Sequence, residues 1–285
     1  MKFIIIFSLI MLYLVDVSAQ FIMPSAFSIN TGELNQTWAP RWDSLIGYWR
    51  FNGPSNGNQI TTGYVIDSDK SGLPSLTVKD GDGTANGVIG FDGNTNANPP
   101  AFKLKKSLKL ANYGNGVSVD YARAGSANDF NDLSAITISV WAQVSETVIR
   151  TNTTVLEKKD SFGIYSCASD QRKICTYVKA TSGTITNLSL GGVSVYADNN
   201  WNHIAMTFID GGKVKLYFNG SLVGQSTGNL TGKLISNSIF TVGTNSDLEF
   251  SAGFPGRLDE LAIWNVVLNS NQIKRIYDRQ KRYSK

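Results

Sequence analysis

Short apolar runs alternate with clusters of Gly, Asn, Ser and Asp from Leu45 onward. Such runs, separated by turn-forming residues, are typical of a β-sandwich or a closed barrel. No helical repeat interrupts them, and a region of about 230 residues fits one large domain of this class. The pattern therefore predicts an all-β domain. Its runs include LIGYWRFN, GVSVDYA, AITISVWAQV, TTVLEKK, FGIYSCA, ICTYVKA, WNHIAMTFID, VKLYFNG, IFTVGT and RLDELAIWN.

Two local signals add detail to this pattern. In KVKLYFNGSLVG, residues 213–218 alternate between two faces, and Asn219-Gly220 supplies the two positive-φ residues of a tight hairpin turn. After LAIWNVVL, Asn269 is placed to cap a helix whose capping box Gln272 completes. Ile273, Ile276 and Tyr277 then share one face of that helix. We expect one short C-terminal helix packed on the β domain.

The first 19 residues have the pattern of a secretory signal peptide. Lys2 gives a basic start, residues 3–15 form an apolar core, and residues 17–19 offer a small-residue cleavage site. The apolar run is too short to cross a membrane, so no integral membrane segment is expected in the mature chain. We divide the sequence into signal peptide (1–19), leader (20–44), domain (45–280) and basic tail (281–285). The expected location is extracellular, or periplasmic in a bacterium.

The chain has two cysteines, Cys167 and Cys175. An even number in an oxidising compartment predicts a disulfide. The flanking residues are β-like and the intervening ASDQRKI is turn-like, so the bridge is expected to staple a hairpin. A metal or redox site is disfavoured, because the spacing is not Cys-x-x-Cys and the chain has a single histidine.

Net charge changes the picture little. The value of +4 at pH 7 arises partly in KRIYDRQKRYSK, where six cations face only Asp278. A nucleic-acid or anionic-surface patch is one interpretation of this segment. The favoured one is a solvated helix end whose cations lie near the helix C-terminus. No nucleic-acid partner is predicted.

The order and spacing of four segments resemble the laminin-G-like group of concanavalin A-like lectin/glucanase domains. They are LIGYWRFN, AITISVWAQV, NWNHIAMTFIDGGKVKLYFNGSLVG and GRLDELAIWNVVLNSNQIKRIY. The resemblance covers roughly residues 45–277 and is most specific toward the C-terminal end. It implies a jelly-roll sandwich of two antiparallel sheets. It also implies binding of carbohydrates or proteins, often around a calcium ion at the rim.

The resemblance places a calcium site between an early Asp-x-Ser-Gly stretch and a late Gly-x-Leu-Asp-Glu stretch. Here these are DKSG, with Asp69, and GRLDE, with Asp259. Backbone carbonyls would complete the oxygen shell that calcium needs. The sequence departs from the pattern after DKSG, where LPSLTVKDGDG replaces a Gly-Asn-rich continuation. If calcium binds, adding it should raise the melting temperature and EDTA should reverse the rise.

Asp259 and Glu260 also raise the question of catalysis. Glycoside hydrolysis needs two carboxyl groups facing one cleft, whereas neighbours on a strand project to opposite faces. We therefore expect Asp259 to meet calcium or rim N–H groups, and Glu260 to meet a cation or donors of a neighbouring strand. No Glu-x-Asp-x-x-Glu, the spacing of catalytic relatives, occurs. His203 begins an apolar run, which favours a structural role over that of a general base. No catalytic residue is predicted.

A lectin site of this architecture combines an aromatic platform with Asn, Asp and Gly, on rim loops or on a sheet. Four tryptophans lie in apolar runs and are expected in the core: Trp49, Trp141, Trp201 and Trp264. Tyrosines in loop-like sequence beside Asn and Asp are better candidates for exposure. The candidate ligand-binding residues are Tyr113, Tyr121, Tyr196 and Asn199.

These observations predict a secreted, non-catalytic recognition module that binds a carbohydrate or a glycosylated surface. Its partner would be a glycan or a cell-surface protein. The first alternative is a protein–protein adhesion module, for which the leader is a joining arm. The second is a glycoside hydrolase whose carboxylates converge from separate strands. The sequence leaves the oligomeric state open.

Overall fold

The structure is a computed structural model of the chain. It describes residues 39–52, 63–79, 90–92, 106–110, 119–144, 153–167, 170–182, 185–189 and 200–281. The compact unit that contains these residues begins at Ala39. The predicted signal peptide, the leader up to Trp38 and the tail beyond Lys281 lie outside the described residues.

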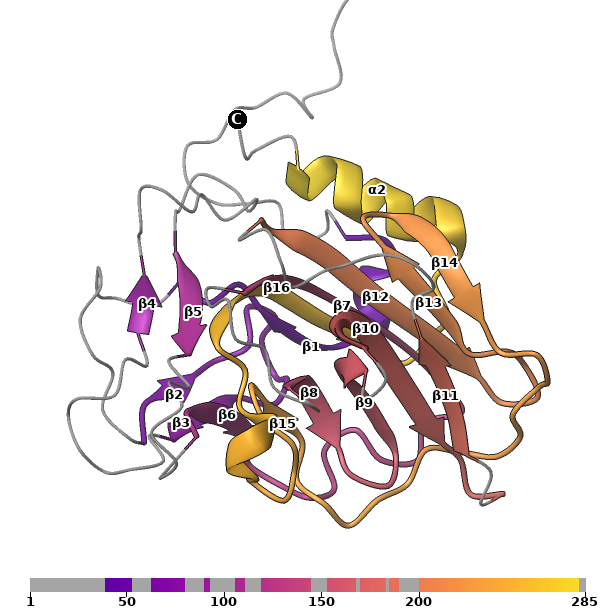
Figure 1. Ribbon diagram of the computed structural model, residues 1–285, viewed down its shortest axis with the longest axis horizontal. Coiled ribbons are helices and arrows are strands. Elements are labelled where there is room, and N and C mark those ends of the chain that lie inside the picture. Colours follow the sequence, from indigo (N-terminus) through magenta and orange to yellow (C-terminus); the bar gives the residue numbers. More distant parts are fainter. Residues whose placement is uncertain are drawn as a thin grey trace, which may run out of the picture. The chain divides into compact units, whose positions relative to one another are not determined.

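The described strands form two antiparallel sheets of eight strands each, packed face to face (Figure 1). The first sheet has the order β14-β13-β12-β7-β16-β5-β4, and β1 also pairs with β16. The strands of this sheet are β1 (Leu45–Trp49), β4 (Gly90–Asp92), β5 (Ser107–Leu110), β7 (Ala135–Val144), β12 (Asn202–Ile209), β13 (Lys215–Phe218), β14 (Ser221–Gln225) and β16 (Gly256–Trp264).

The second sheet has the order β11-β10-β9-β8-β15-β6-β3-β2. Its strands are β2 (Val65–Ile66), β3 (Leu76–Lys79), β6 (Tyr121–Ala124), β8 (Thr154–Lys158), β9 (Phe162–Cys167), β10 (Asp170–Lys179), β11 (Ile185–Ser189) and β15 (Thr241–Val242). The described helices are the short 3-10 turns η2 (Trp42–Ser44) and η3 (Phe250–Ala252) and the α-helix α2 (Ser270–Lys281). The predicted jelly-roll sandwich with one short C-terminal helix is confirmed.

Alternation along the central strand β7 places the core between the sheets. Every second side chain of AITISVWAQV enters it: Ile136, Ile138, Val140, Ala142 and Val144. The intervening Thr137, Ser139 and Trp141 face the opposite side and are also buried. Trp141 stacks on Tyr277 of α2, with ring centroids 5.6 Å apart. β7 is thus covered on both faces, by the second sheet and by α2.

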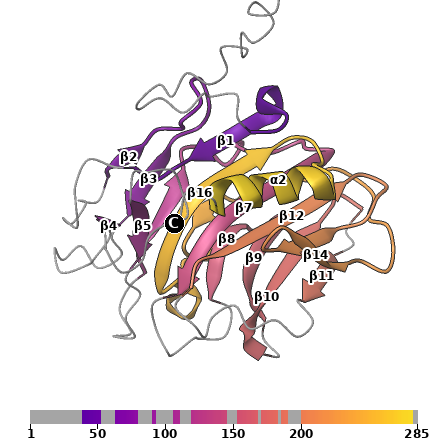
Figure 2. The ribbon, with the colours of Figure 1, turned by 90° about the horizontal axis from the view of Figure 1, so that it is seen from above.

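Helix α2 lies along the outside of the first sheet, over β7, β12 and β16 (Figure 2). Its predicted capping box is present: the backbone N–H of Gln272 donates to Asn269 Oδ1 at 3.0 Å, and that of Asn269 donates to Gln272 Oε1 at 2.9 Å. Ile273 and Ile276 are buried, as their shared helical face predicts. Packing of this face holds a helix too short to be stable alone.

Both predicted hairpins form. Asn219 and Gly220 have φ of 47° and 78°, and they join β13 to β14. Cys167 and Cys175 form a disulfide within the β9–β10 hairpin. Strand β10 already begins at Asp170, so the turn is shorter than ASDQRKI suggests. Cys175 lies opposite Tyr165 in the register of this hairpin, which places the disulfide beside that tyrosine.

Replacing Cys167 and Cys175 together with serine should lower the free energy of unfolding by about 2–3 kcal/mol, because the bridge closes a short loop in the unfolded chain. Denaturant titration of the variant measures the loss. Titration of the wild-type protein after reduction is the matched control and should give a similar value. An unchanged unfolding midpoint in both would show that the pairing of β9 with β10 is independent of the bridge.

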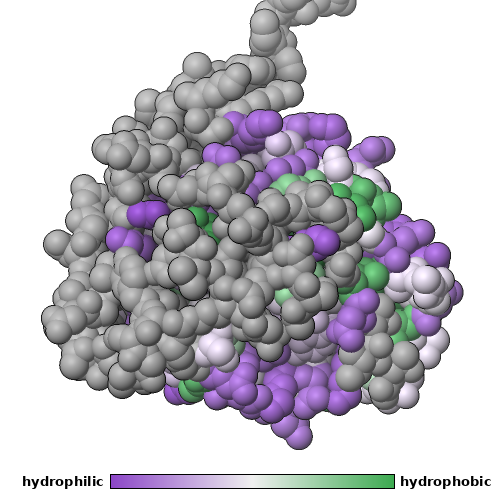
Figure 3. Space-filling view, in the orientation of Figure 1, coloured by the Kyte–Doolittle hydropathy of each residue, from purple (hydrophilic) through white to green (hydrophobic). Residues whose placement is uncertain are grey.

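Among the described residues, no helix has the length and apolar character needed to cross a membrane. The described surface on the face seen in Figure 3 is mostly hydrophilic, with separate hydrophobic groups rather than one continuous patch. Exposed large apolar side chains occur singly on several elements. They are Val65, Ile209, Leu222, Ile235, Leu248 and Val267.

Candidate functional site

A row of residues crosses the outer face of the second sheet. Asn187 pairs with Tyr177, Tyr177 with Gly163, Gly163 with Glu157, and Glu157 with Thr241, on five adjacent strands. Directly opposite residues of antiparallel strands project to the same face. The sequence neighbours of Tyr177 and Gly163 on the other face are packed in or against the core. The row therefore faces away from the core.

Tyr177 lies flat across this row because Gly163 has no side chain. A Cβ atom built on Gly163 would lie 2.6 Å from Cε1 of Tyr177. The Tyr177 hydroxyl donates to Glu157 Oε1 at 3.0 Å, with Lys158 O at 3.3 Å, which fixes the far end of the ring. One face of the ring covers the Gly163 backbone, so its other face is turned away from the sheet.

Tyr165 stands beside Tyr177 on the same face. The ring centroids are 6.0 Å apart, with an interplanar angle of 58°. The hydroxyl of Tyr165 reaches Asn187 Oδ1 at 3.5 Å, and both tyrosines are partly exposed. We name this cluster the tyrosine platform, defined as Tyr165, Tyr177, Gly163, Glu157 and Asn187. Two tilted rings beside a carboxylate and an amide present apolar and polar contacts together.

The platform keeps its hydroxyl groups protonated near neutral pH. Burial raises the pKa of the Tyr177 phenol, and Glu157 raises it further. Burial also raises the pKa of Tyr165. The pKa of Glu157 is raised by burial too, although the backbone N–H of Ser246 donates to its Oε2 at 2.6 Å and opposes the rise. Each phenol donates its single O–H to Glu157 or Asn187, so its oxygen can accept a hydrogen bond from a ligand.

The flat position of Tyr177 gives a prediction at Gly163. In Gly163→Ala the new methyl group meets the ring at 2.6 Å, so the ring must lift off the sheet and binding at the platform should weaken roughly tenfold. Calorimetry with any ligand found to bind the wild-type protein measures the change. Gly125→Ala is the matched control, since nothing lies within 4 Å of its added Cβ. Equal affinities for the two variants would contradict the role given to the ring.

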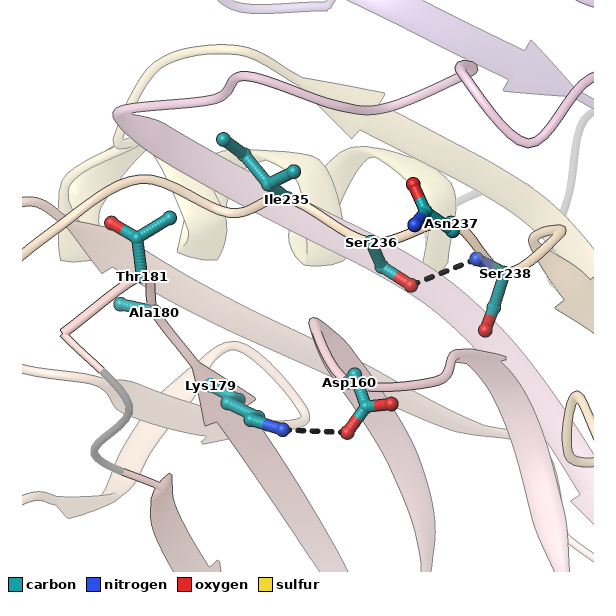
Figure 4. A pocket seen from close by; sticks show the side chains of 8 residues that line it. All are labelled: Asp160, Lys179, Ala180, Thr181, Ile235, Ser236, Asn237 and Ser238. Atoms are coloured by element: carbon teal, nitrogen blue, oxygen red, sulfur yellow. Dashed lines mark hydrogen bonds and ion pairs between the residues drawn. The ribbon is translucent and has the colours of Figure 1, made fainter.

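A pocket of about 390 Å³, which we name the rim pocket, opens next to the β8–β9 turn (Figure 4). In Figure 4 the ion pair of Lys179 and Asp160 lies opposite the segment from Ile235 to Ser238. Lys179 Nζ lies 2.7 Å from Asp160 Oδ1. The remaining lining residues are Ala180 and Thr181. Lys179 follows Tyr177 by two residues on β10, so the pocket adjoins the tyrosine platform.

The two adjacent carboxylates of β16 do not lie on opposite faces, and that prediction is wrong. Glu260 has a φ of 51°, and the pairing of β16 with β7 shifts between Asp259 and Ala262, as at a β-bulge. Asp259 lies opposite Trp141, whose Nε1 donates to Gln280 Oε1 of α2 at 2.6 Å. Gln280 Nε2 donates to Glu260 Oε2 at 3.0 Å. The bulge thus turns both carboxylates toward α2.

Neither carboxylate is open to a substrate, since Asp259 is 0% and Glu260 1% exposed. The Tyr48 hydroxyl donates to Glu260 Oε2 at 2.6 Å, and the Glu260 backbone N–H donates to Asp259 Oδ1 at 2.8 Å. The other oxygens, Asp259 Oδ2 and Glu260 Oε1, have no hydrogen-bond partner among the described residues. Burial raises the pKa of both carboxyl groups, and the Glu260 charge raises that of Asp259 further. The pair therefore holds protons more tightly than exposed carboxylates do.

A family model described as the concanavalin A-like lectin/glucanases superfamily matches residues 115–274. This match covers more than half of the chain, and the jelly-roll sandwich agrees with it. The chain belongs to this superfamily. No curated protein matches its sequence.

Solved structures share the superfamily fold at low identity. Domain 4 of AbnA, an extracellular arabinanase of Geobacillus stearothermophilus in complex with arabinotriose, is 17% identical with a TM-score of 0.54, covering 82% of this chain and 98% of that one. The binding domain of Paraclostridial Mosquitocidal Protein 1 is 18% identical (TM-score 0.55; 83% and 52% covered). The binding domain of Botulinum neurotoxin DC, in complex with rat synaptotagmin II, is 14% identical (TM-score 0.58; 84% and 52% covered). The chain spans about half the length of these two toxin domains.

Both aspartates of the calcium site implied by the superfamily resemblance accept hydrogen bonds from the protein itself. Asp69 Oδ1 lies 2.6 Å from Arg50 Nη2 and accepts from Arg50 Nε at 2.7 Å, while Oδ2 accepts from the Arg50 backbone N–H at 2.7 Å. Asp259 Oδ1 accepts from a backbone N–H. Within the ranges that the structure describes, no three His, Cys, Asp or Glu side chains group as metal ligands. Calcium binding stays a prediction.

The bond between Arg50 and Asp69 gives the calcium prediction a sharp test. If the guanidinium is the cation of this site, calcium chloride and EDTA should leave the melting temperature of the wild-type protein unchanged. Arg50→Met should lower that temperature with either addition, because it removes the guanidinium from Asp69 Oδ1 and leaves only the backbone N–H at Oδ2. A melting temperature of the wild type that rises with calcium and falls back with EDTA would instead support a bound ion.

The structure places only one of the predicted ligand-binding residues. Tyr121 lies on strand β6 and is 8% exposed, so it is buried rather than displayed on a loop. Tyr113, Tyr196 and Asn199 lie outside the described residues. Tyr165 and Tyr177 are not among the residues predicted from the sequence. The disulfide hairpin was the available signal. In its register Tyr165 lies opposite Cys175, which is two positions before Tyr177 on β10, so both tyrosines project to the same face of the sheet.

The predicted core positions are mostly confirmed. Trp49, Trp141 and Trp264 are buried, and Trp201 is partly exposed. His203 is fully buried, with Nε2 2.8 Å from Ser139 Oγ, and burial lowers its pKa to about 3. A neutral, enclosed imidazole that packs against Trp141 agrees with the predicted structural role.

Proposed function

We propose that this chain is a secreted, non-catalytic recognition module that binds carbohydrate through the tyrosine platform. The single observation that carries the proposal is the flat Tyr177 ring, seated on Gly163 and fixed by Glu157, with Tyr165 beside it. The apolar C–H faces of a sugar ring pack on an exposed aromatic face. The surrounding hydroxyl, amide and carboxylate groups match sugar hydroxyls, which donate and accept hydrogen bonds.

The superfamily and its neighbours support a binding role. The similar solved structures include domain 4 of AbnA in complex with arabinotriose and the binding domain of Botulinum neurotoxin DC in complex with rat synaptotagmin II. The Asp259–Glu260 pair is enclosed under α2, which removes the most obvious carboxylates from the reach of a glycosidic bond. Export is supported by the apolar N-terminal stretch and by the Cys167–Cys175 disulfide.

A glycan array tests the proposal directly. The folded protein, with its disulfide intact, should bind at least one class of oligosaccharide, and added soluble oligosaccharide should compete for that binding. Chromogenic glycosides of the same class should not be turned over. A folded protein that binds no glycan, or that hydrolyses one, would overturn the proposal.

Recognition of a protein is the second candidate, favoured by the neurotoxin domain in complex with synaptotagmin. It differs from the first in its response to sugar. A pull-down from cell-surface extract that recovers one partner, unchanged by added oligosaccharide or by deglycosylation of the extract, would support adhesion through protein contacts. Release of the partner by oligosaccharide would support the tyrosine platform instead.

A further inference from the structure

The rim pocket is built before any ligand arrives. Lys158 is fully buried, and its Nζ donates to Ala127 O at 2.7 Å and to Ser238 O at 2.8 Å. The Asn131 side chain brackets Ser236, accepting from its backbone N–H at 2.9 Å and donating to its carbonyl at 2.8 Å. Ser236 Oγ also donates to Lys159 O. These bonds hold the pocket wall against the β8–β9 turn. The wall is therefore already ordered, and a ligand would lose little binding free energy to ordering it.

The lining combines free polar groups with an apolar contact. Neither the Asn237 amide nor the Ser238 hydroxyl bonds to another side chain or backbone group of the described residues. Ile235 is 46% exposed at the same wall. An amide offers two donors and an acceptor, and a hydroxyl offers both. A ligand with several hydroxyl groups and an apolar face matches this set.

The charges of the pocket cancel. Lys179 and Asp160 are the only ionisable side chains of its lining, and they bond to each other at 2.7 Å. An anionic ligand group would have to compete with Asp160 for Lys179, and it would lie beside a carboxylate. A neutral ligand needs no such exchange. The pocket therefore favours uncharged sugars over sialylated, sulfated or uronic ones.

We infer that the rim pocket is a second sugar-binding subsite, which takes a neutral sugar unit of an oligosaccharide whose neighbouring unit lies on the tyrosine platform. Lys179 and Tyr177 are two residues apart on one strand face, with their Cα atoms about 7 Å apart. One chain can thus reach both places. This inference rests on the proposed carbohydrate-binding function and adds to it a preference for neutral chains longer than a single unit.

Two changes test the inference together: the length of the oligosaccharide, and a substitution that fills the rim pocket. Wild-type protein is measured by calorimetry with neutral mono- to hexasaccharides of the arabino, xylo, gluco, galacto and manno series, and with sialyllactose and galacturonan oligomers. Affinity for the neutral series that binds should rise about tenfold between the monosaccharide and the tetrasaccharide. Asn237→Trp, which fills the pocket at an exposed position, should remove this rise and keep the monosaccharide affinity.

Asn229→Trp is the matched control, because Asn229 is exposed in the same segment but does not line the pocket. In Asn229→Trp the affinity should still rise with the length of the oligosaccharide. Both variants should melt near the wild-type temperature. A rise that survives in Asn237→Trp, or tighter binding of the acidic sugars, overturns the inference while the platform stands. Absence of binding by every sugar to the wild type overturns the platform and the subsite together.

Discussion

The double substitution of Tyr165 and Tyr177 by alanine is expected to remove detectable oligosaccharide binding. A central, partly enclosed aromatic contributes about 2 kcal/mol to binding, or roughly 30-fold in affinity, so two such rings account for about 1,000-fold. Surface plasmon resonance on an immobilised polysaccharide measures the loss. The fold should persist, because both side chains lie outside the hydrophobic core cluster between the sheets.

Tyr177→Phe separates the ring from its hydroxyl group. It keeps the flat aromatic face on Gly163 and removes the bond to Glu157 Oε1. Binding should fall only a few-fold, since the aromatic face remains in place and the lost hydrogen bond joins two protein groups rather than protein and ligand. Unchanged affinity of the double alanine variant, with an unchanged melting temperature, would exclude the platform as the binding site.

Local chemistry in the sequence was enough to predict much of this fold. The capping box of Asn269 and Gln272 and the turn at Asn219-Gly220 depend on residues close in sequence, and the structure has both. The disulfide was predictable because two cysteines allow one pairing. The order of strands in the two sheets was not predicted, since apolar runs alone do not say which strands pair, and the resemblance implies only a sandwich of two antiparallel sheets.

The bulge at Glu260 could not be predicted by counting alternate positions. A single residue with positive φ moves the following side chains to the opposite face, so Leu258, Leu261 and Ile263 all enter the core. Nothing in GRLDELAIWN requires this, because Glu has no preference for left-handed backbone. The contacts that favour it come from Tyr48 and Gln280, which are remote in sequence.

The tyrosine platform was hidden for a similar reason. Tyr177 is flat only because Gly163 lies opposite it and Glu157 lies one strand further on. Which residues lie opposite Tyr177 and Gly163 depends on the register of the β9–β10 and β8–β9 hairpins. The sequence pattern instead predicts exposed aromatics in loop-like segments, where Asn and Asp are frequent. The tyrosine platform lies on a sheet face, and the predicted loop residues Tyr113, Tyr196 and Asn199 lie outside the described residues.

The second large effect is expected at Asp259. A carboxyl group whose pKa is higher in the folded protein than in the unfolded chain binds more protons when folded, so its stabilising effect is present at low pH and is lost as the pH rises through the folded value. The charged groups around Asp259 are Glu260, Asp69 and Arg50, and the buried environment has the largest effect. The free energy of unfolding should thus increase as the pH falls from 7 toward 5, by at most about 1.4 kcal/mol per pH unit for each carboxyl group that is protonated in the folded protein and ionised in the unfolded chain.

Asp259→Asn removes one of the two coupled charges and keeps the shape of the side chain. At pH 7 it should be more stable than the wild type by roughly 1–3 kcal/mol, because a buried carboxylate without a cation destabilises the fold. The free energy of unfolding of this variant should change less between pH 5 and 7 than that of the wild type, since Glu260 is the one carboxyl group of the pair that remains. Urea titrations at several pH values measure both effects, with Asp278→Asn on the exposed side of α2 as control.

A less stable Asp259→Asn at pH 7, with an unaltered pH profile, would mean that the Asp259 carboxylate is compensated, as by a bound cation. The same titrations repeated with calcium and with EDTA would then identify that cation.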